Sequence, residues 1–269
     1  MWLNEHLKRN QKNAGENHVD KVYGIHAATS FLTNHPQAVK QCYLLKQPFA
    51  PQFTPIIDLC EKHQIVHRWL TKTEFSQVLD SAVHQGVYLD ITPLPLYSEN
   101  DLLNFVGEIS QPKLLILDCI QDPQNLGACL RTACAAGIDA VILPKDKAAG
   151  LTPAVRKVAC GAAEIVPICQ VTNLARTMRE LQNLGIWLVG LAGTAEQTIY
   201  ETNLTGKIAI VAGAEHRGLR RLTQEHCDFM AAIPITGSIE SLNVSVATGV
   251  ALFELVRQGI EHSKCPKIS

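Results

Sequence analysis

The chain has 269 residues, of which 46% are hydrophobic and 18% are charged, and its formal net charge is −1. This length and mixture are sufficient for one large or two modest domains with buried cores, and they exclude an extensively disordered protein. The near-neutral charge gives no sign of a nucleic-acid partner, although a local basic patch is enough for phosphate contacts.

The cysteines and the apolar runs exclude further classes. Nine cysteines occur, and no two of them have the C-x-x-C spacing of a zinc or redox site. Most lie in apolar or small-residue stretches, which favours buried thiols in a reducing cytoplasm and predicts neither disulfides nor a metal site. No apolar run is long enough to cross a bilayer, so we expect no membrane partner. Residues 1–20 are polar, lack the apolar core of a secretion signal, and are expected to form a flexible tail.

Residues 21–95 predict a small α/β domain. Apolar residues recur at helical spacing over residues 22–33. Thr71 and Glu74 form a capping-box pattern that opens another helix. The other expected elements are a strand at 41–45, a helix at 55–63, a strand at 65–70 and a strand at 86–91. The polar stretch with prolines that follows predicts a linker over residues 96–112.

Residues 113–269 predict a second domain with a parallel sheet. Apolar runs bounded by turn residues predict strands at 113–119, 139–143, 164–168, 186–192 and 207–212. Helices are expected between them, at 126–136 and 174–184, and a long helix is expected at 242–261. Alternating strands and helices favour a parallel sheet covered by helices, and such sheets bind ligands at the carboxyl ends of their strands.

The first of three loops at that edge covers residues 118–127. Asn125 suits a helix N-cap, and Gly127 permits a close backbone approach. Arg131 projects from the following helix on a side other than its apolar face. Taken alone, a capped helix with one solvated arginine explains these residues. The helix is rich in Ala, Cys and Gly, which favours tight packing against another backbone, for example in a subunit interface.

The second loop covers residues 211–218 and also follows an apolar strand. Gly213 and Gly218 allow the chain to turn sharply and to approach a ligand. The G-x-G-x-x-G spacing of a dinucleotide loop is missing, so a strand-ending turn is an adequate explanation of this loop by itself.

The third loop covers residues 233–245 and leads into the last helix. Ser241, Asn243 and Ser245 lie at the start of that helix, where they are explained as capping residues. The free N–H groups and the positive dipole end of a helix also suit a carboxylate or a phosphate. The loop has more polar side chains than one cap requires.

Together, in this order and spacing, the three loops resemble the signature of the SpoU/TrmH family of RNA ribose methyltransferases. The family pattern has an Asn-x-Gly loop followed by an Arg, then a Gly-x-Glu-x-x-Gly loop, then a Pro…Gly…Ser-Leu-Asn-Val-Ser run. The matching residues are Asn125, Gly127, Arg131, Gly213, Glu215, Gly218, Pro234, Gly237 and 241–245. His216 stands where the family pattern frequently has a glycine.

The resemblance extends upstream. Tyr-Gly-Ile-His-Ala at residues 23–27 and His-Gln-Gly-Val at 84–87 resemble the substrate-binding domain that precedes the catalytic domain in one branch of the family. That branch includes an enzyme that methylates a guanosine ribose in the peptidyl-transferase P loop of 23S ribosomal RNA. The resemblance therefore implies that reaction, with 23S rRNA or its assembly intermediate as partner. Basic residues that are candidates for phosphate contacts, or simply surface residues, are Lys40, Lys46, Arg68 and Lys72.

The resemblance also implies the fold and the assembly. Members of this family, the SPOUT methyltransferases, thread the C-terminal segment through a loop to form a deep trefoil knot. S-adenosylmethionine sits bent in that knot, and the dimer packs around the first and last helices of the catalytic domain. We therefore expect an α/β fold with a knotted parallel sheet, preceded by a small L30e-like domain that binds RNA, in a homodimer.

By the same resemblance, the cofactor should contact Gly213, Ile233 and Leu242, largely through backbone groups and apolar surface. This is chemically reasonable, because an adenine ring needs hydrogen bonds at its edge and apolar contacts on its faces.

Arg131 is the residue expected to be central to catalysis, which must position a ribose hydroxyl, remove its proton and exclude water. Two roles stay open for Arg131. It is either the base, which is demanding for a guanidinium, or the group that holds the RNA phosphate and stabilises the developing alkoxide. The residues expected to orient Arg131, the ribose and the loops are Asn125, Glu215, Ser241 and Asn243.

Three other functions remain open. The same reaction on transfer RNA or on another ribosomal site differs only in substrate. A non-catalytic RNA-binding protein fits the small N-terminal domain, but the intact catalytic loops argue against it. A Rossmann-type dehydrogenase is disfavoured by the missing glycine fingerprint. A cofactor titration separates the enzyme from the binding protein.

Overall fold

The computed structural model describes residues 20–48, 50–78, 84–92, 94, 96–146, 148–214 and 218–264. Apart from Asp20, the expected tail therefore lies outside the described residues. The chain divides into two compact units: residues up to Pro95 together with Leu151–Ile165 form unit 1, and Leu96–Gly150 together with residues from Val166 onwards form unit 2.

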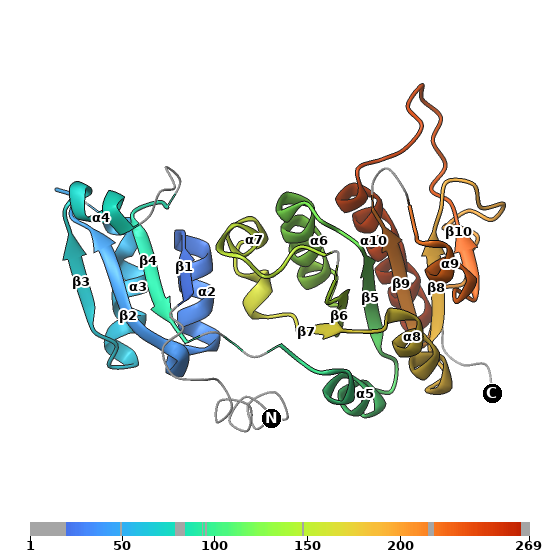
Figure 1. The fold of residues 1–269 in the computed structure, drawn as a ribbon, viewed down its shortest axis with the longest axis horizontal. Coiled ribbons are helices and arrows are strands. Elements are labelled where there is room, and N and C mark those ends of the chain that lie inside the picture. Colours follow the sequence, from blue (N-terminus) through green and yellow to red (C-terminus); the bar gives the residue numbers. More distant parts are fainter. Residues whose placement is uncertain are drawn as a thin grey trace. The chain divides into compact units, whose positions relative to one another are not determined.

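Unit 1 contains a four-stranded mixed sheet in the order β1-β4-β2-β3 (Figure 1). The strands are β1 (Asp20–Tyr23), β2 (Val39–Leu45), β3 (His67–Leu70) and β4 (Val87–Ile91). β2 runs parallel to β3, and β4 is antiparallel to both β1 and β2. One face packs its apolar side chains against α2 (Ile25–Asn34) and α3 (Thr54–Lys62). Two short 3₁₀ turns, η2 (Pro36–Ala38) and η3 (Pro51–Phe53), precede β2 and α3.

The helix predicted from residue 22 begins three residues later. Asp20–Tyr23 pair with β4 as an edge strand, and Gly24 then takes a φ of 98°, which separates strand from helix. Sheet pairing therefore overrides the helical periodicity of the first few residues.

The other face of this sheet packs against α4 (Lys72–Val78). Phe75 of α4 contacts Tyr88, which stacks on Tyr43 with ring centroids 4.4 Å apart. The predicted capping box is confirmed: the Thr71 N–H donates to Glu74 Oε2 at 2.7 Å, and the Glu74 N–H donates to Thr71 Oγ1 at 3.4 Å.

Unit 1 also includes α7 (Pro153–Ala159) and the 3₁₀ turn η4 (Ala162–Glu164). Their polar centre is buried: Arg156 Nη1 donates to Glu164 Oε1 at 2.6 Å, and His35 Nε2 lies 2.7 Å from the Glu164 carbonyl oxygen. The strand predicted at 164–168 was wrongly placed, because residues 162–164 form this turn and the strand itself begins at Ile168.

Unit 2 contains a six-stranded sheet in the order β10-β8-β9-β5-β6-β7 (Figure 1). The strands are β5 (Lys113–Asp118), β6 (Ala140–Pro144), β7 (Ile168–Val171), β8 (Trp187–Leu191), β9 (Ile208–Gly213) and β10 (Phe229–Ala231). Each neighbouring pair is parallel, so the predicted parallel sheet is confirmed.

Helices cover both faces of this sheet. α5 (Glu99–Gly107) and α8 (Leu174–Asn183) share a core with Leu114 and Ile116 of β5, and the short α9 (Arg221–Glu225) packs on α8. α5 lies within the stretch expected to be a linker, and its Leu102 and Val106 are part of this core.

The opposite face carries α6 (Pro123–Ala135) and α10 (Val244–Lys264). α10 packs on β9 and on α6, where Cys129 Sγ lies 3.8 Å from Thr248 Oγ1. A Cβ added at Gly249 would lie 3.7 Å from Thr132 Cγ2, so the two helices come close. The small-residue helix α6 thus packs tightly against α10 of the same chain. Among the described residues, no helix is both long and apolar enough to span a membrane.

Candidate active site

Two of the three loops begin side by side in unit 2. Asp118 and Gly213, the last residues of β5 and β9, are direct neighbours in the sheet. β5 is the first strand of this sheet along the chain, and later strands are added on both sides of it. The carboxyl ends of β5 and β9 therefore form a topological switch point, the place where open parallel sheets bind ligands.

An ion pair joins the first loop to the end of the second. Asp118 is fully buried, and its carboxylate accepts hydrogen bonds from the Arg220 backbone N–H at 2.9 Å and from Arg220 Nε at 2.7 Å. The hydrogen bond that Arg220 donates to Asp118 raises the pKa of the Arg220 guanidinium above its ordinary value. This pair holds the chain after Gly218 against the end of β5. Sequence reasoning missed it, because the two residues are 102 positions apart.

Glycine is required at position 213 because the backbone of Gly218 and Leu219 comes too close to leave room for a Cβ. A Cβ at this position would lie 2.2 Å from the Gly218 carbonyl carbon and 2.4 Å from Leu219 N. The Gly218 N–H donates to the Ala214 carbonyl at 2.8 Å, and Gly218 has a φ of 60°. The two glycines therefore close a tight turn. Glu215 and His216 lie between them, outside the described residues.

The expectation that Asn125 is the N-cap of its helix is wrong. α6 begins two residues earlier, with Pro123 in its first turn, and Asp122 Oδ1 caps it by accepting from the Gln124 N–H at 3.0 Å. Asn125 is instead buried inside the first turn, and its Oδ1 accepts a hydrogen bond from Asn243 Nδ2 at 2.9 Å. The side chain thus connects the first loop to the third.

Asn243 supplies the cap that was expected at the last helix. Its Oδ1 accepts from the Ser245 N–H at 2.9 Å and from Ser245 Oγ at 2.6 Å, at the start of α10. Both the capping role and the contact with another loop are therefore filled by one side chain.

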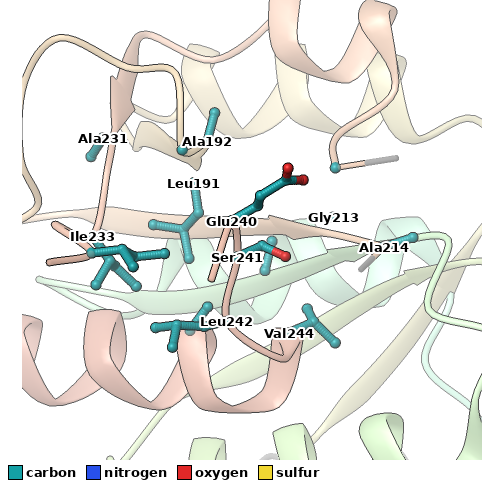
Figure 2. A pocket seen from close by; sticks show the side chains of 15 residues that line it. Leu191, Ala192, Gly213, Ala214, Ala231, Ile233, Glu240, Ser241, Leu242 and Val244 are labelled. Carbon is teal, nitrogen blue, oxygen red and sulfur yellow. The ribbon is translucent and has the colours of Figure 1, made fainter. Parts of the chain in front are cut away.

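A pocket of about 150 Å³ opens to solvent at the carboxyl edge of this sheet (Figure 2). Most of its walls are small or apolar, and backbone from several strand ends contributes to it. The lining residues are 191–193, 212–214, Gly218, Ala231, Ile233, Ile235, 240–242, Val244 and Ala247.

The structure thus brings Gly213, Ile233, Ser241 and Leu242 to one pocket and places Asn125 and Asn243 in contact nearby in the fold. Arg131 lies on α6 with an exposed side chain and is not among the residues that line the pocket. Within the described part of the chain, no three His, Cys, Asp or Glu side chains gather to hold a metal ion.

Sequence reasoning missed part of the pocket wall, which comes from the ends of β8 and β10. Ala192, the last residue of the predicted strand at 186–192, and Gly193 after it were the available signal for the first of these. β10 has three residues, too few for a periodic pattern.

Comparison with known proteins agrees with this geometry. Residues 112–253 match the family model described as SpoU rRNA Methylase family, which covers more than half of the chain. The chain belongs to the SpoU family. In this family member, residues 21–97 also match a model described as RNA 2′-O ribose methyltransferase substrate binding. The family identified from the three loops is confirmed.

Relatives of this SpoU family member are similar over nearly their whole length. It is 49% identical over 239 residues to 23S rRNA (guanosine-2′-O-)-methyltransferase RlmB of Escherichia coli K12, an alignment that covers 89% of this chain and 98% of the relative. It is 52% identical over 240 residues to the protein of the same name from Haemophilus ducreyi, with the same coverage.

Solved structures share the fold. The SpoU methyltransferase AviRb from Streptomyces viridochromogenes aligns with a TM-score of 0.76 at 19% identity, over 95% of this chain and 93% of that one. An RNA 2′-O ribose methyltransferase aligns with a TM-score of 0.74 at 22% identity, over 93% and 91% of the two chains. The predicted α/β architecture, a parallel sheet preceded by a small domain, is confirmed by these matches.

Proposed function

We propose that this protein is an S-adenosylmethionine-dependent methyltransferase that acts on the 2′-hydroxyl of a guanosine in the P loop of 23S ribosomal RNA. The observation that carries the proposal is the identity of about half of the residues with RlmB proteins over nearly their entire length. The pocket at the switch point of the parallel sheet supports it, because that is where such a sheet binds a cofactor.

The pocket fits the proposed cofactor chemically. Ile233 and Leu242 offer apolar surface for an adenine ring, and the backbone around Gly213 offers hydrogen-bonding groups at close range. Ser241 adds a hydroxyl suited to a ribose or carboxylate oxygen. Bound S-adenosylmethionine would supply an electrophilic methyl group on a sulfonium.

The exposed side chain of Arg131 on α6 supports a role in contact with a macromolecular substrate. We propose that its guanidinium holds an RNA phosphate and stabilises negative charge on the ribose oxygen, with a role as base as the alternative. Asn125 and Asn243 would fix the loops around it through their hydrogen bond. Glu215 is proposed to orient the second loop.

RNA recognition is assigned to the small N-terminal domain, residues 21–95, and catalysis to residues 113–269; residues 96–112, which include α5 of unit 2, join the two. The match to a substrate-binding model supports this assignment. Lys40, Lys46, Arg68 and Lys72 all have exposed side chains in this domain, and we propose them as phosphate contacts. A trefoil knot in the catalytic domain belongs to the same proposal. A ribosomal substrate implies a cytoplasmic site of action.

A homodimer is supported by a stripe of exposed apolar residues on α10. Val246, Phe253 and Ile260 are 51%, 50% and 48% exposed, and their spacing of seven places them on one side of the helix. Burial of this stripe in a subunit interface would remove it from water. Phe253→Glu should shift the sedimentation coefficient from that of a dimer to that of a monomer, whereas a monomeric wild-type protein would contradict the proposal.

The substrate is tested by mapping ribose methylation along 23S rRNA from cells with and without the gene. Loss of one guanosine mark in the P loop, restored by the wild-type gene and not by an Arg131→Ala copy, is expected. A complete set of 23S marks in the deletion strain, with a mark missing from transfer RNA, would assign the enzyme to the alternative substrate.

A further inference from the structure

A carboxylate lies at the wall of the pocket. Of the described residues that line it, Glu240 alone has an ionisable side chain. Figure 2 shows its carboxylate at the pocket, in the same view as the apolar side chains of Leu191, Ile233 and Leu242. The other described residues of the pocket wall are uncharged, so none of them offsets the negative charge of Glu240.

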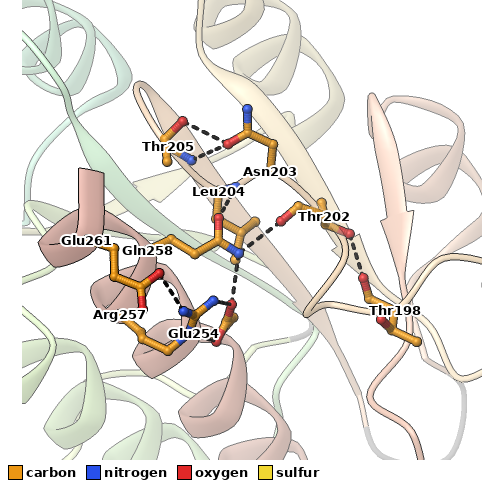
Figure 3. A network of polar contacts seen from close by, with 9 residues as sticks. All are labelled: Thr198, Thr202, Asn203, Leu204, Thr205, Glu254, Arg257, Gln258 and Glu261. Atoms are coloured by element: carbon orange, nitrogen blue, oxygen red, sulfur yellow. Dashed lines mark hydrogen bonds and ion pairs between the residues drawn. The ribbon is translucent and has the colours of Figure 1, made fainter. Parts of the chain in front are cut away.

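Within the described part of the chain, the Glu240 carboxylate has no hydrogen bond or ion pair. Two other carboxylates of this unit have structural partners: Asp118 binds Arg220, and Glu254 binds Arg257 (Figure 3). The side chain is exposed and lies in the third loop, so it does not contribute to a buried core. The carboxylate is therefore available to a bound molecule.

The two forms of the cofactor differ by one charge. S-adenosylmethionine has a sulfonium, an ammonium and a carboxylate, with a net charge of +1. When its methyl group passes to the ribose oxygen, the sulfur keeps the electron pair of the broken S–C bond and becomes a neutral thioether, and the ribose hydroxyl gives up its proton, which carries away the positive charge. The product, S-adenosylhomocysteine, then has no net charge, because its ammonium and carboxylate cancel.

We propose that Glu240 makes the pocket selective for the charge of the cofactor, so that it favours S-adenosylmethionine over S-adenosylhomocysteine. The negative carboxylate attracts the cationic form and has little net attraction for the neutral one. Selectivity of this kind lowers inhibition by the product and promotes its release. This inference rests on the proposed function, since it takes S-adenosylmethionine as the methyl donor.

The expected size follows from the exposure of Glu240. Charge pairs open to solvent typically change an affinity by about two- to fivefold. Such an effect is screened by salt, so the preference of the wild-type protein for S-adenosylmethionine should weaken as ionic strength rises.

The test is a calorimetric titration of both cofactor forms into the full-length protein and four variants. Glu240→Gln should weaken the affinity for S-adenosylmethionine about two- to fivefold and leave the affinity for S-adenosylhomocysteine nearly unchanged. Glu240→Lys should shift the ratio of the two dissociation constants further in the same direction. Glu108→Gln, which removes an exposed carboxylate at the end of α5, is the matched control and should leave both constants unchanged.

The outcomes separate this inference from the proposed function. If Glu240→Gln weakens the affinities for both forms equally, or changes neither affinity, the charge selectivity is overturned. A wild-type protein that binds neither form would overturn the proposed cofactor itself. Thermal unfolding of each variant is measured in parallel, and Glu240→Asp, which retains the charge, should keep the wild-type ratio even if its overall affinity falls.

Discussion

The side-chain amide of Asn243 joins two loops that are 118 residues apart, by donating from Nδ2 to Asn125 Oδ1 at 2.9 Å. Its oxygen is used at the same time, as the acceptor for the Ser245 N–H and Oγ at the start of α10. One amide therefore links the beginnings of α6 and α10, the two helices that pack on the same face of the sheet. An Asn is suited to this position because it offers both a donor and an acceptor.

The two functions of this amide, the cap of α10 and the bridge to Asn125, can be separated by mutation. Asn243→Ala removes cap and bridge together, so the free energy of unfolding should fall by about 1–2 kcal/mol. Asn243→Asp keeps an acceptor for the cap but has no donor for Asn125. It should retain most of the stability and still lose methylation of a 23S rRNA fragment. Chemical denaturation and a methyl-transfer assay measure the two effects, and full activity in Asn243→Asp would show that the bridge has no part in the reaction.

Arg131→Ala should lower turnover by about a hundredfold or more, since it removes a charge that acts on the transition state. The exposed position on α6 predicts a change in unfolding free energy within about 0.5 kcal/mol. Affinity for S-adenosylmethionine should be nearly unchanged. Arg179→Ala, at another exposed arginine on α8, is the control and should keep activity. An Arg131→Ala enzyme with wild-type turnover would assign catalysis to a different residue.

Much of the catalytic-domain fold could be predicted from local pattern. The strands that became β5, β8 and β9 were correct within about two residues, because each is a continuous apolar run bounded by turn residues. β10 could not be found this way, since a three-residue strand has no periodicity and is defined by its pairing with β8.

The candidate site was predictable in its loops and less so in its contacts. The Asn125 error had a local signal that was overlooked: Pro123 suits the first turn of a helix, which marks Asp122 as the cap. The pairing of Asp118 with Arg220 had no local signal, because only the folded sheet brings the two segments together. The role of Glu215, which lies outside the described residues, stays a prediction.

The Asp118–Arg220 pair provides a stability test with a neighbouring control. Arg220→Met leaves a fully buried carboxylate without its ion partner, so the free energy of unfolding should fall by about 3 kcal/mol. Arg221→Met breaks only an exposed ion pair with Glu225, so its free energy of unfolding should fall by about 0.5 kcal/mol or less. Denaturant titrations of both variants measure the difference. Equal losses in the two would mean that the buried pair contributes no more than the exposed one.

The buried polar centre of unit 1 predicts a pH dependence of stability. Burial lowers the pKa of His35 below its ordinary value of 6.5; a hydrogen bond to the Glu164 carbonyl opposes this shift, and the nearby Arg156 adds to it. Below pH 6.5 the unfolded chain therefore takes up a proton that the folded protein resists. The folded state should lose stability as the pH falls from about 7.5 towards the lowered pKa of His35.

Glu164 changes the stability with pH in the opposite direction to His35. Burial raises its pKa above the ordinary value of 4.5, although Arg156 opposes the shift, so its contribution to stability is lost as the pH rises through the raised pKa. A substitution at His35 isolates the first effect. In His35→Asn, the fall in unfolding free energy between pH about 7.5 and about 5.5 should be smaller than in the wild-type protein. Denaturant titrations across this range test it, and parallel curves for the two proteins would show that His35 does not resist protonation in the folded state.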